Sequence, residues 1–135
     1  MNTTFIKTTM KKLLLLTLAL ILSHTVNAQQ DKQKKLLKHV VMFGWKPGTD
    51  AASIDKVIAD FGNLKHKIKI IKTYEWGINN SPENLNNGLT HCFVLTFNSA
   101  LDRDAYLIHP AHKAFVSILN PAPDKVTVLD YWTNK

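Results

Sequence analysis

Four stretches of the chain have the hydrophobic pattern of β-strands, with apolar side chains at every second position or at nearly every position. They span residues 39–45, 68–76, 90–97 and 126–132. In the first stretch both alternating sets are mostly apolar, which is typical of a strand covered on two faces. Turn-forming residues separate the strands: Lys46-Pro47-Gly48 follows the first, Gly77 ends the second, and the Asn-rich segment 79–88 predicts a loop.

A first helix is predicted between the first two strands. Either Thr49 or Asp50 is placed to cap it, because short polar side chains accept hydrogen bonds from the free N–H groups of a first helical turn. Its apolar residues fall at helical spacing and form one stripe: Ile54, Val57, Ile58, Phe61 and Leu64.

A second helical segment is predicted to break in its middle. Ser99 is placed to cap its start, and the first piece is expected to bury Leu101, Tyr106 and Leu107. His109 precedes Pro110 and is therefore held out of helical geometry, whereas Pro110 suits the first turn of a new helix. The second piece is expected to run to residues 120–121, with an apolar side made of Phe115, Ile118 and Leu119.

The order strand, helix, strand, strand, broken helix, strand predicts an α+β fold. It is the ferredoxin-like βαββαβ arrangement, a four-stranded antiparallel sheet with the helices on one face. The opposite face would then expose apolar side chains of the first and third strands, Val40, Met42, Cys92 and Val94. We expect a second subunit to cover this bare face, which predicts a homodimer.

Residues 1–28 have the pattern of a signal peptide. Three lysines precede the apolar run 13–22, and Val26-Asn27-Ala28 fits a signal-peptidase site. The run is about half of the ~20 residues that span a bilayer, so we expect cleavage, export to a periplasmic or secreted location, and no stable membrane span afterwards. An uncleaved anchor is the alternative. Residues 29–36 then form a polar leader, and residues 37–135 a single domain.

Charge and cysteine content limit the classes of function. The chain has 17 basic and ten acidic residues, a formal net charge of +7, and without the signal peptide 14 basic residues remain and the charge is +4. Lys32, Lys34 and Lys35 lie in the leader, so the domain is nearly neutral and no nucleic-acid partner is expected. Cys92 is the only cysteine, which excludes an intramolecular disulfide and, between apolar neighbours, predicts a buried and unreactive thiol.

One phenol and two imidazoles lie within seven residues, at Tyr106, His109 and His112. Histidine changes charge near neutral pH, and tyrosine donates a hydrogen bond from a largely apolar ring, so this segment is a candidate for binding or acid–base chemistry. Strand parity places His39 and His91 on the same side of the sheet. We expect these polar groups to meet in a small-molecule pocket with an apolar lining of Val41, Phe43, Leu95, Phe61 and Phe115.

A plainer interpretation stays open, in which Tyr106 and His109 serve only the junction between the two helical pieces. A lone strand histidine is more often a satisfied structural residue than a ligand, and the convergence of several polar groups is what argues otherwise. The spacing of His109 and His112 suits a metal, but the proline between them and the lack of an evident third ligand argue against one. No metal and no cofactor are predicted.

Four segments carry a wider pattern: Leu37-Lys-His39-Val-Val-Met-Phe43, Thr90-His91-Cys-Phe-Val-Leu-Thr-Phe97, Tyr106-Leu-Ile-His109-Pro-Ala-His112 and Val128-Leu-Asp130-Tyr131. Together they resemble the stress-responsive dimeric A/B barrel (Dabb) family. The resemblance extends over residues 37–132 and implies a ferredoxin-like subunit that pairs with a second copy as a dimeric α/β barrel.

The family includes plant stress proteins without an established reaction and a plant polyketide cyclase that makes olivetolic acid. By resemblance to that cyclase, His112 is the implied general base and Tyr106 the implied donor to a developing oxyanion. The resemblance also implies that His39 and His91 line the pocket and that Asp130 orients His112.

Three functions follow as alternatives. The first is a domain that binds a small apolar carbonyl or phenolic molecule, with no assigned reaction. The second is a cofactor-free cyclase, lyase or isomerase that uses His112 and Tyr106. The third is a structural, stress-protective oligomer.

Overall fold

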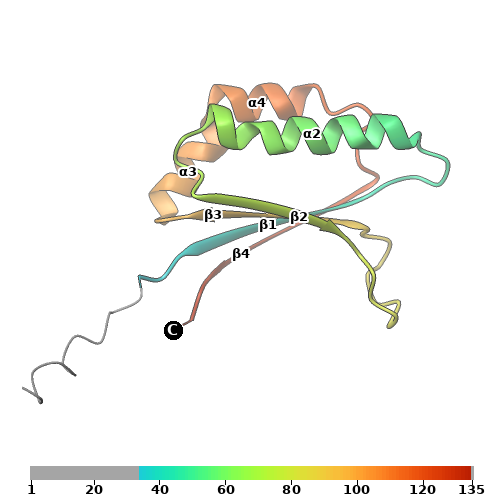
Figure 1. Ribbon diagram of the computed structural model, residues 1–135, viewed down its shortest axis with the longest axis horizontal. Helices are drawn as coiled ribbons and strands as arrows, with labels where there is room; N and C mark the ends of the chain where they lie inside the picture. Colours follow the sequence, from blue (N-terminus) through green and yellow to red (C-terminus); the bar gives the residue numbers. More distant parts are fainter. Residues whose placement is uncertain (1–33, 135) are drawn as a thin grey trace, which may run out of the picture. The chain divides into compact units, whose positions relative to one another are not determined.

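The computed structural model describes residues 34–134, so the predicted signal peptide and most of the leader lie outside the described residues. Figure 1 shows one sheet with the helices of these residues on the same side of it, which confirms the predicted α+β, ferredoxin-like arrangement. In chain order the elements are β1 (Leu37–Gly44), α2 (Ala51–Lys67), β2 (Thr73–Ile78), β3 (His91–Phe97), α3 (Ala100–Ile108), α4 (Pro110–Ser117) and β4 (Lys125–Trp132).

The strands form an antiparallel sheet in the order β2-β3-β1-β4. β1 therefore pairs with β3 on one side and with β4 on the other. One row of directly opposed residues crosses the whole sheet and consists of Tyr74, Leu95, His39 and Asp130. Opposed residues in a sheet point to the same face, and Leu95 is fully buried beneath the helices. All four side chains therefore face the helices.

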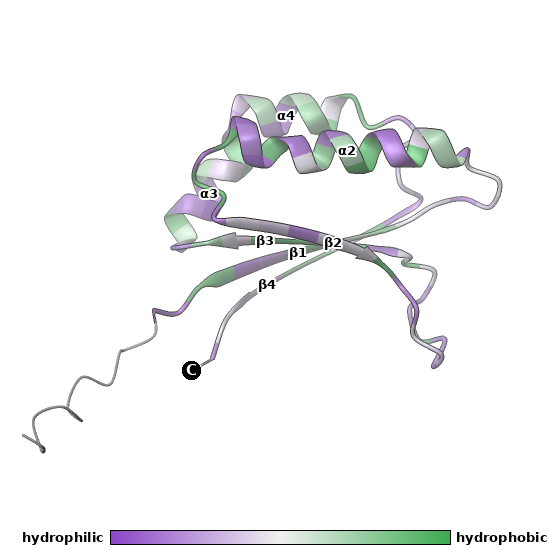
Figure 2. Ribbon diagram, in the orientation of Figure 1, coloured by the Kyte–Doolittle hydropathy of each residue, from purple (hydrophilic) through white to green (hydrophobic). Residues whose placement is uncertain are grey.

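α2 begins at the predicted cap. The Asp50 carboxylate accepts hydrogen bonds from the Ser53 N–H at 2.9 Å and from the Ser53 hydroxyl at 2.8 Å, which hold the pKa of Asp50 below its ordinary value. Figure 2 shows hydrophobic and hydrophilic segments alternating along the helix. The apolar stripe is buried against the sheet at Val57, Ile58, Phe61 and Leu64.

An aromatic cluster fills the layer between the sheet and the helices. The Phe61 ring lies 4.7 Å from that of Phe93 and 4.9 Å from that of Phe115, between centroids, and Phe43 lies 5.2 Å from Phe93. All four side chains are buried. Because β1, β3, α2 and α4 each contribute one ring, the cluster holds both helices on the sheet.

The face of the sheet away from the helices is uncovered within residues 34–134. The four side chains predicted to lie there are each half-buried, namely Val40, Met42, Cys92 and Val94. β4 extends this face with Leu129 and Tyr131, which are 55% and 46% exposed and oppose Val40 and Lys38. Cys92 is half-buried where full burial was expected, and its partial burial raises the pKa of the thiol.

The second strand differs from its prediction, since β2 begins at Thr73 and continues through Gly77 to Ile78. Ile68 instead ends α2 by donating its N–H to the Leu64 carbonyl at 2.8 Å, and the Ile71 N–H bonds the Ile68 carbonyl at 3.2 Å. Both isoleucines are buried. Their apolar side chains therefore close the core beneath the end of α2 and are not part of a strand.

The break in the second helical segment is confirmed, and the Ser99 hydroxyl caps α3 by accepting the Asp102 N–H at 3.1 Å. α3 buries Tyr106 alone, because Leu101 is 79% and Leu107 39% exposed. Leu101 precedes Tyr106 by five residues, about 140° around a helix, so the two cannot share one face. α4 also ends earlier than predicted, at Ser117, which leaves Ile118 exposed.

In the part of the chain that the structure describes, no helix combines the length and the hydrophobicity that crossing a membrane requires.

Candidate functional site

A cavity of about 380 Å³ lies between the helix-facing side of the sheet and helices α3 and α4. Four polar side chains line it, His39, Tyr106, His112 and Asp130, and we call it the His/Tyr cavity. Its apolar wall includes four of the predicted lining residues, Val41, Phe43, Phe61 and Phe115. A volume of this size and a mostly apolar lining with a few polar groups are typical of small-molecule sites.

The His/Tyr cavity opens between β4 and α4. Val126 and Val128 of β4 line it and are nevertheless 55% and 54% exposed, and Val116 of α4 lines it at 51% exposure. β4 is an edge strand, and α4 is only eight residues long, so neither fully covers the other. A ligand can therefore enter along an apolar rim.

Tyr106 is the most buried polar residue of the cavity. Its side chain is fully buried, and its hydroxyl has no hydrogen-bond partner among the described residues. Its ring packs against those of His112, Phe97 and His39, with centroid distances of 4.3, 5.3 and 5.8 Å. Burial, with a smaller effect of Tyr74, raises the pKa of Tyr106, so the phenol stays protonated and is available as a hydrogen-bond donor.

His112 is half-buried near the start of α4, and its Nδ1 lies 3.1 Å from the Leu107 carbonyl oxygen. A carbonyl oxygen only accepts, so Nδ1 carries the proton and Nε2 of the neutral ring holds the free lone pair. Burial lowers the pKa of His112, the bond to Leu107 opposes this, and His39 and His109 lower it further. The ring is therefore neutral at neutral pH, and its Nε2 is free to accept a proton.

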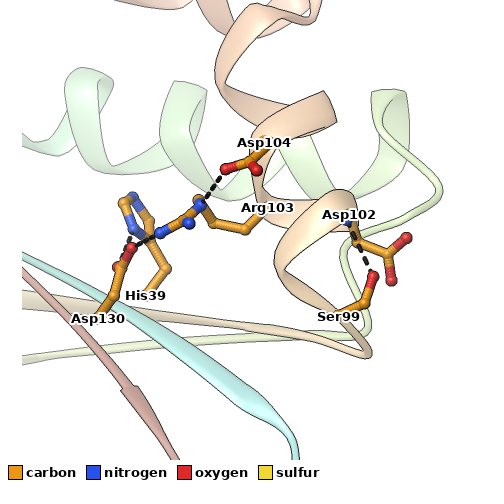
Figure 3. A network of polar contacts seen from close by, with 6 residues as sticks. All are labelled: His39, Ser99, Asp102, Arg103, Asp104 and Asp130. Atoms are coloured by element: carbon orange, nitrogen blue, oxygen red, sulfur yellow. Dashed lines mark hydrogen bonds and ion pairs between the residues drawn. The ribbon is translucent and has the colours of Figure 1, made fainter.

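Asp130 bonds His39 and not His112, which corrects the role implied by the resemblance. Asp130 Oδ1 lies 2.6 Å from His39 Nδ1, and Oδ2 accepts a hydrogen bond from the Arg103 guanidinium. Figure 3 shows these side chains converging from β1, β4 and α3. The His39 side chain is only 6% exposed, so the carboxylate meets an imidazole that is shielded from solvent. The cavity therefore contains two oriented imidazoles, one held by a carbonyl and one by a carboxylate.

His91, predicted to line the same pocket, does not line the His/Tyr cavity. It faces the helices, but it lies at the other end of β3, where its Nδ1 accepts the Trp45 indole N–H at 3.0 Å and contacts the Thr90 hydroxyl at 2.9 Å. Burial lowers the pKa of His91, while Asp55 opposes this. Strand parity correctly indicates the face of a residue, but position along the strand decides which site it reaches.

Two further predicted residues also lie outside the cavity lining. His109 caps α4, since its Nδ1 accepts the Ala111 N–H at 3.1 Å. For His109 this agrees with the plainer interpretation that the sequence left open, whereas Tyr106 lines the cavity. Leu95 is fully buried in the core and does not line the cavity.

Several residues of the site have no motif of their own in the sequence. Val126 and Val128 follow from the alternation of β4 once its helix-facing set is known, because they share parity with Asp130. Arg103 precedes Tyr106 by three residues, a spacing that places both on one face of α3. This three-residue spacing is the sequence pattern from which Arg103 could have been predicted to lie beside Tyr106.

A second hollow of about 460 Å³ lies at the end of the sheet beside the loop that follows β2, and Met42, Leu85, Leu89, His91 and Cys92 are among its lining residues. Its lining comes partly from the bare face of the sheet and partly from this exposed loop. Neither of the two buried, unpaired side-chain oxygens of residues 34–134 lines it. Within the same residues, no three His, Cys, Asp or Glu side chains are grouped as metal ligands.

Comparison with protein families finds a match over residues 37–133 to the family described as Stress responsive A/B Barrel Domain (Dabb). The stress-response A/B barrel domain-containing protein HS1 of Arabidopsis thaliana is 38% identical over 101 residues, 75% of this chain and 93% of that protein. Olivetolic acid cyclase of Cannabis sativa is 28% identical over 99 residues, 73% of this chain and 98% of the cyclase.

Solved structures share the fold. The hydroxynitrile lyase from Passiflora edulis superposes with a TM-score of 0.70 and 31% identity, over 76% of this chain and 96% of the lyase. A dimeric protein of unknown function with a ferredoxin-like fold, from Bacteroides fragilis, has a TM-score of 0.56 and 25% identity over 71% of this chain and 94% of its own.

Proposed function

The chain belongs to the stress responsive A/B barrel domain family, and we propose that it binds a small, largely apolar carbonyl or phenolic molecule in the His/Tyr cavity. The observation that carries the proposal is the Tyr106 hydroxyl, which is buried without a hydrogen-bond partner among the described residues. Leaving a buried hydroxyl unpaired costs roughly 1–3 kcal/mol, and a ligand oxygen would remove that cost.

The rest of the cavity supports an apolar ligand that carries one polar end. Val41, Phe43, Phe61 and Phe115 offer no hydrogen bonds, whereas the imidazoles of His39 and His112 lie beside Tyr106. A ligand whose ring or alkyl chain enters between β4 and α4 would place its oxygen against the phenol.

The test compares two probes of similar shape that differ in one oxygen. Benzaldehyde offers a carbonyl and toluene does not, and each is titrated while the thermal unfolding midpoint is recorded, since a ligand that binds only the folded state raises it. We expect benzaldehyde to stabilise the wild type more than toluene does, and Tyr106→Phe to remove the difference. Equal effects of the two probes on the wild type would contradict the proposal.

Acid–base catalysis next to a carbonyl is the second candidate function. It is favoured by the free Nε2 lone pair of His112 and by the position of its ring, 4.3 Å from that of Tyr106. In this reaction His112 Nε2 takes a proton from the carbon beside the carbonyl, and Tyr106 donates to the oxygen that gains charge. The similarity to a cyclase and to a hydroxynitrile lyase supports this class of chemistry.

Hydrogen–deuterium exchange tests the catalytic proposal without knowledge of the substrate. The methyl protons of acetophenone, next to its carbonyl, exchange in D2O and are followed by NMR. We expect the protein to accelerate exchange and His112→Ala to reduce the acceleration by about 10²–10⁴-fold, the usual contribution of a general base. No acceleration over buffer would leave binding as the function, and a protein that neither binds nor exchanges would support the structural oligomer.

Two further expectations complete the proposal. The bare face of the sheet and the dimeric neighbour from Bacteroides fragilis support a homodimer in which a second copy covers Val40, Met42 and Leu129. The pattern of residues 1–28 supports export, which fractionation of expressing cells and the mass of the recovered protein test together.

A further inference from the structure

Arg103 connects a charged network to the His/Tyr cavity. One nitrogen of its guanidinium binds Asp130 Oδ2, and its Nε donates to Asp104 Oδ1 at 2.7 Å (Figure 3). The first oxygen of Asp130 holds His39 Nδ1 at 2.6 Å. Asp130 is thus bound at both oxygens, by a cation from α3 and an imidazole from β1.

Binding at both oxygens fixes the plane of the carboxylate. A carboxylate bound at one oxygen turns about its terminal torsion, which has a broad energy profile, and the imidazole turns with it. With both oxygens held, the direction in which His39 donates is set. Nδ1 then carries the proton, and Nε2, at the opposite side of the ring, keeps a free lone pair in the cavity.

The arginine also decides how the charge is balanced. Asp130 and Arg103 have side chains that are 25% and 23% exposed, so each is partly shielded from water and needs a counter-charge. The hydrogen bond to Asp104, together with Asp130, raises the pKa of Arg103, which is therefore charged at any working pH. Because Arg103 supplies a positive charge beside Asp130, the carboxylate has a counter-charge that does not come from His39.

Arg103 also holds α3, the helix that carries Tyr106, against the sheet. α3 has nine residues and buries only Tyr106, so few apolar contacts hold it to the sheet. Arg103 lies on the face of α3 that Tyr106 occupies and reaches β4 through Asp130. One ion pair therefore links the placement of the phenol to the orientation of the His39 ring.

We propose that Arg103 is a positioning residue of the His/Tyr cavity: through Asp130 it holds His39 in the tautomer that presents Nε2 to a ligand. This deepens the proposed function, since the oriented ring serves the ligand bound there. An ordinary surface ion pair would add little stability and would not act on a cavity side chain.

Histidine NMR tests the proposal without any ligand. Two-bond ¹⁵N–¹H spectra of ¹⁵N-histidine-labelled protein distinguish the two tautomers, and His39→Gln assigns the signal. We expect wild-type His39 to carry its proton on Nδ1 and Arg103→Met to give a mixture of tautomers or the Nε2–H form. Arg103→Lys, which keeps the charge, should restore the Nδ1–H signal at least in part. Asp104→Asn is the matched control, since it removes the other partner of Arg103, and should leave His39 unchanged.

Some outcomes would overturn the proposal. These are an Nε2–H tautomer in the wild type, an unchanged His39 signal in a folded R103M, or an R103K signal as altered as that of R103M. The amide spectrum of each variant establishes that it is folded, and Arg103→Gln, which keeps a donor N–H without charge, replaces R103M if that variant does not fold.

A binding measurement separates this proposal from the function on which it rests. We expect the dissociation constant of phenol, whose hydroxyl can donate to His39 Nε2, to rise about tenfold in R103M, as loss of one oriented hydrogen bond implies, and to stay unchanged in D104N. If the wild type binds neither phenol nor benzaldehyde, the proposed function fails while the tautomer result still decides the role of Arg103. If it binds phenol and R103M binds equally well, Arg103 does not position the site.

Discussion

Removal of the Tyr106 hydroxyl should stabilise the protein while weakening the site. In Tyr106→Phe the ring keeps its contacts with His112, Phe97 and His39, so packing is unchanged. The lost hydroxyl is buried and has no partner within residues 34–134. Its desolvation costs roughly 1–3 kcal/mol in the folded state, and that cost disappears in the variant. For a domain of this size, each kcal/mol raises the unfolding midpoint by about 4–8 °C.

Thermal and urea unfolding, followed by circular dichroism, measure this gain. Tyr74→Phe is the matched control, because the Tyr74 hydroxyl is also buried without a partner in the described residues but does not line the His/Tyr cavity. We expect both variants to be more stable than the wild type and only Y106F to lose the preference for benzaldehyde over toluene. A Y106F protein less stable than the wild type would refute the reasoning, since its hydroxyl would then be satisfied in the folded state.

Three further predictions concern pH, assembly and the core. Burial lowers the pKa of His112 from its ordinary 6.5, so acetophenone exchange should persist below pH 6.5, which a pH–rate curve measures. The free energy of unfolding should fall below that pH, because His112 of the unfolded chain binds a proton at a higher pH than His112 of the folded protein. Unfolding curves at several pH values measure this loss. Met42→Lys or Val94→Lys should give monomers by light scattering, whereas Leu101→Lys, at a 79% exposed position, should leave the dimer intact. Phe61→Ala removes a ring that is 2% exposed and should cost about 3–5 kcal/mol in urea unfolding; a cost near zero would contradict the aromatic core.

Local patterns predicted the elements that depend on local chemistry. The caps at Asp50 and Ser99 follow from short polar side chains before amphipathic stretches, and the break at Pro110 follows from the steric demands of proline. The second strand was placed too early because an apolar isoleucine serves a strand and a covered turn equally well. Ile68 is buried beneath a helix end, and only the packed structure distinguishes the two environments.

The candidate site was predicted to the extent that it depends on strand parity. Parity correctly placed His39 and His91 on the helix-facing side, but it carries no information on distance along a strand. His39 opposes Leu95 near the end of the sheet where α3 packs, whereas His91 opposes Phe43 at the other end. Two histidines of the same parity therefore reach different surroundings, one beside Tyr106 and one beside Trp45.

The hydrogen-bond partner of Asp130 could not be predicted from any local motif. β1 and β4 are the first and last strands, so no turn joins them, and everything folded between them sets their register. That register opposes His39 to Asp130, and a slip of one residue would turn the carboxylate to the bare face. His112 instead reaches the cavity on α4, whose start is fixed locally by Pro110. The resemblance names all three residues, but the long-range register decides that the carboxylate belongs to His39. The second oriented imidazole of the cavity, and the role inferred for Arg103, follow from that register.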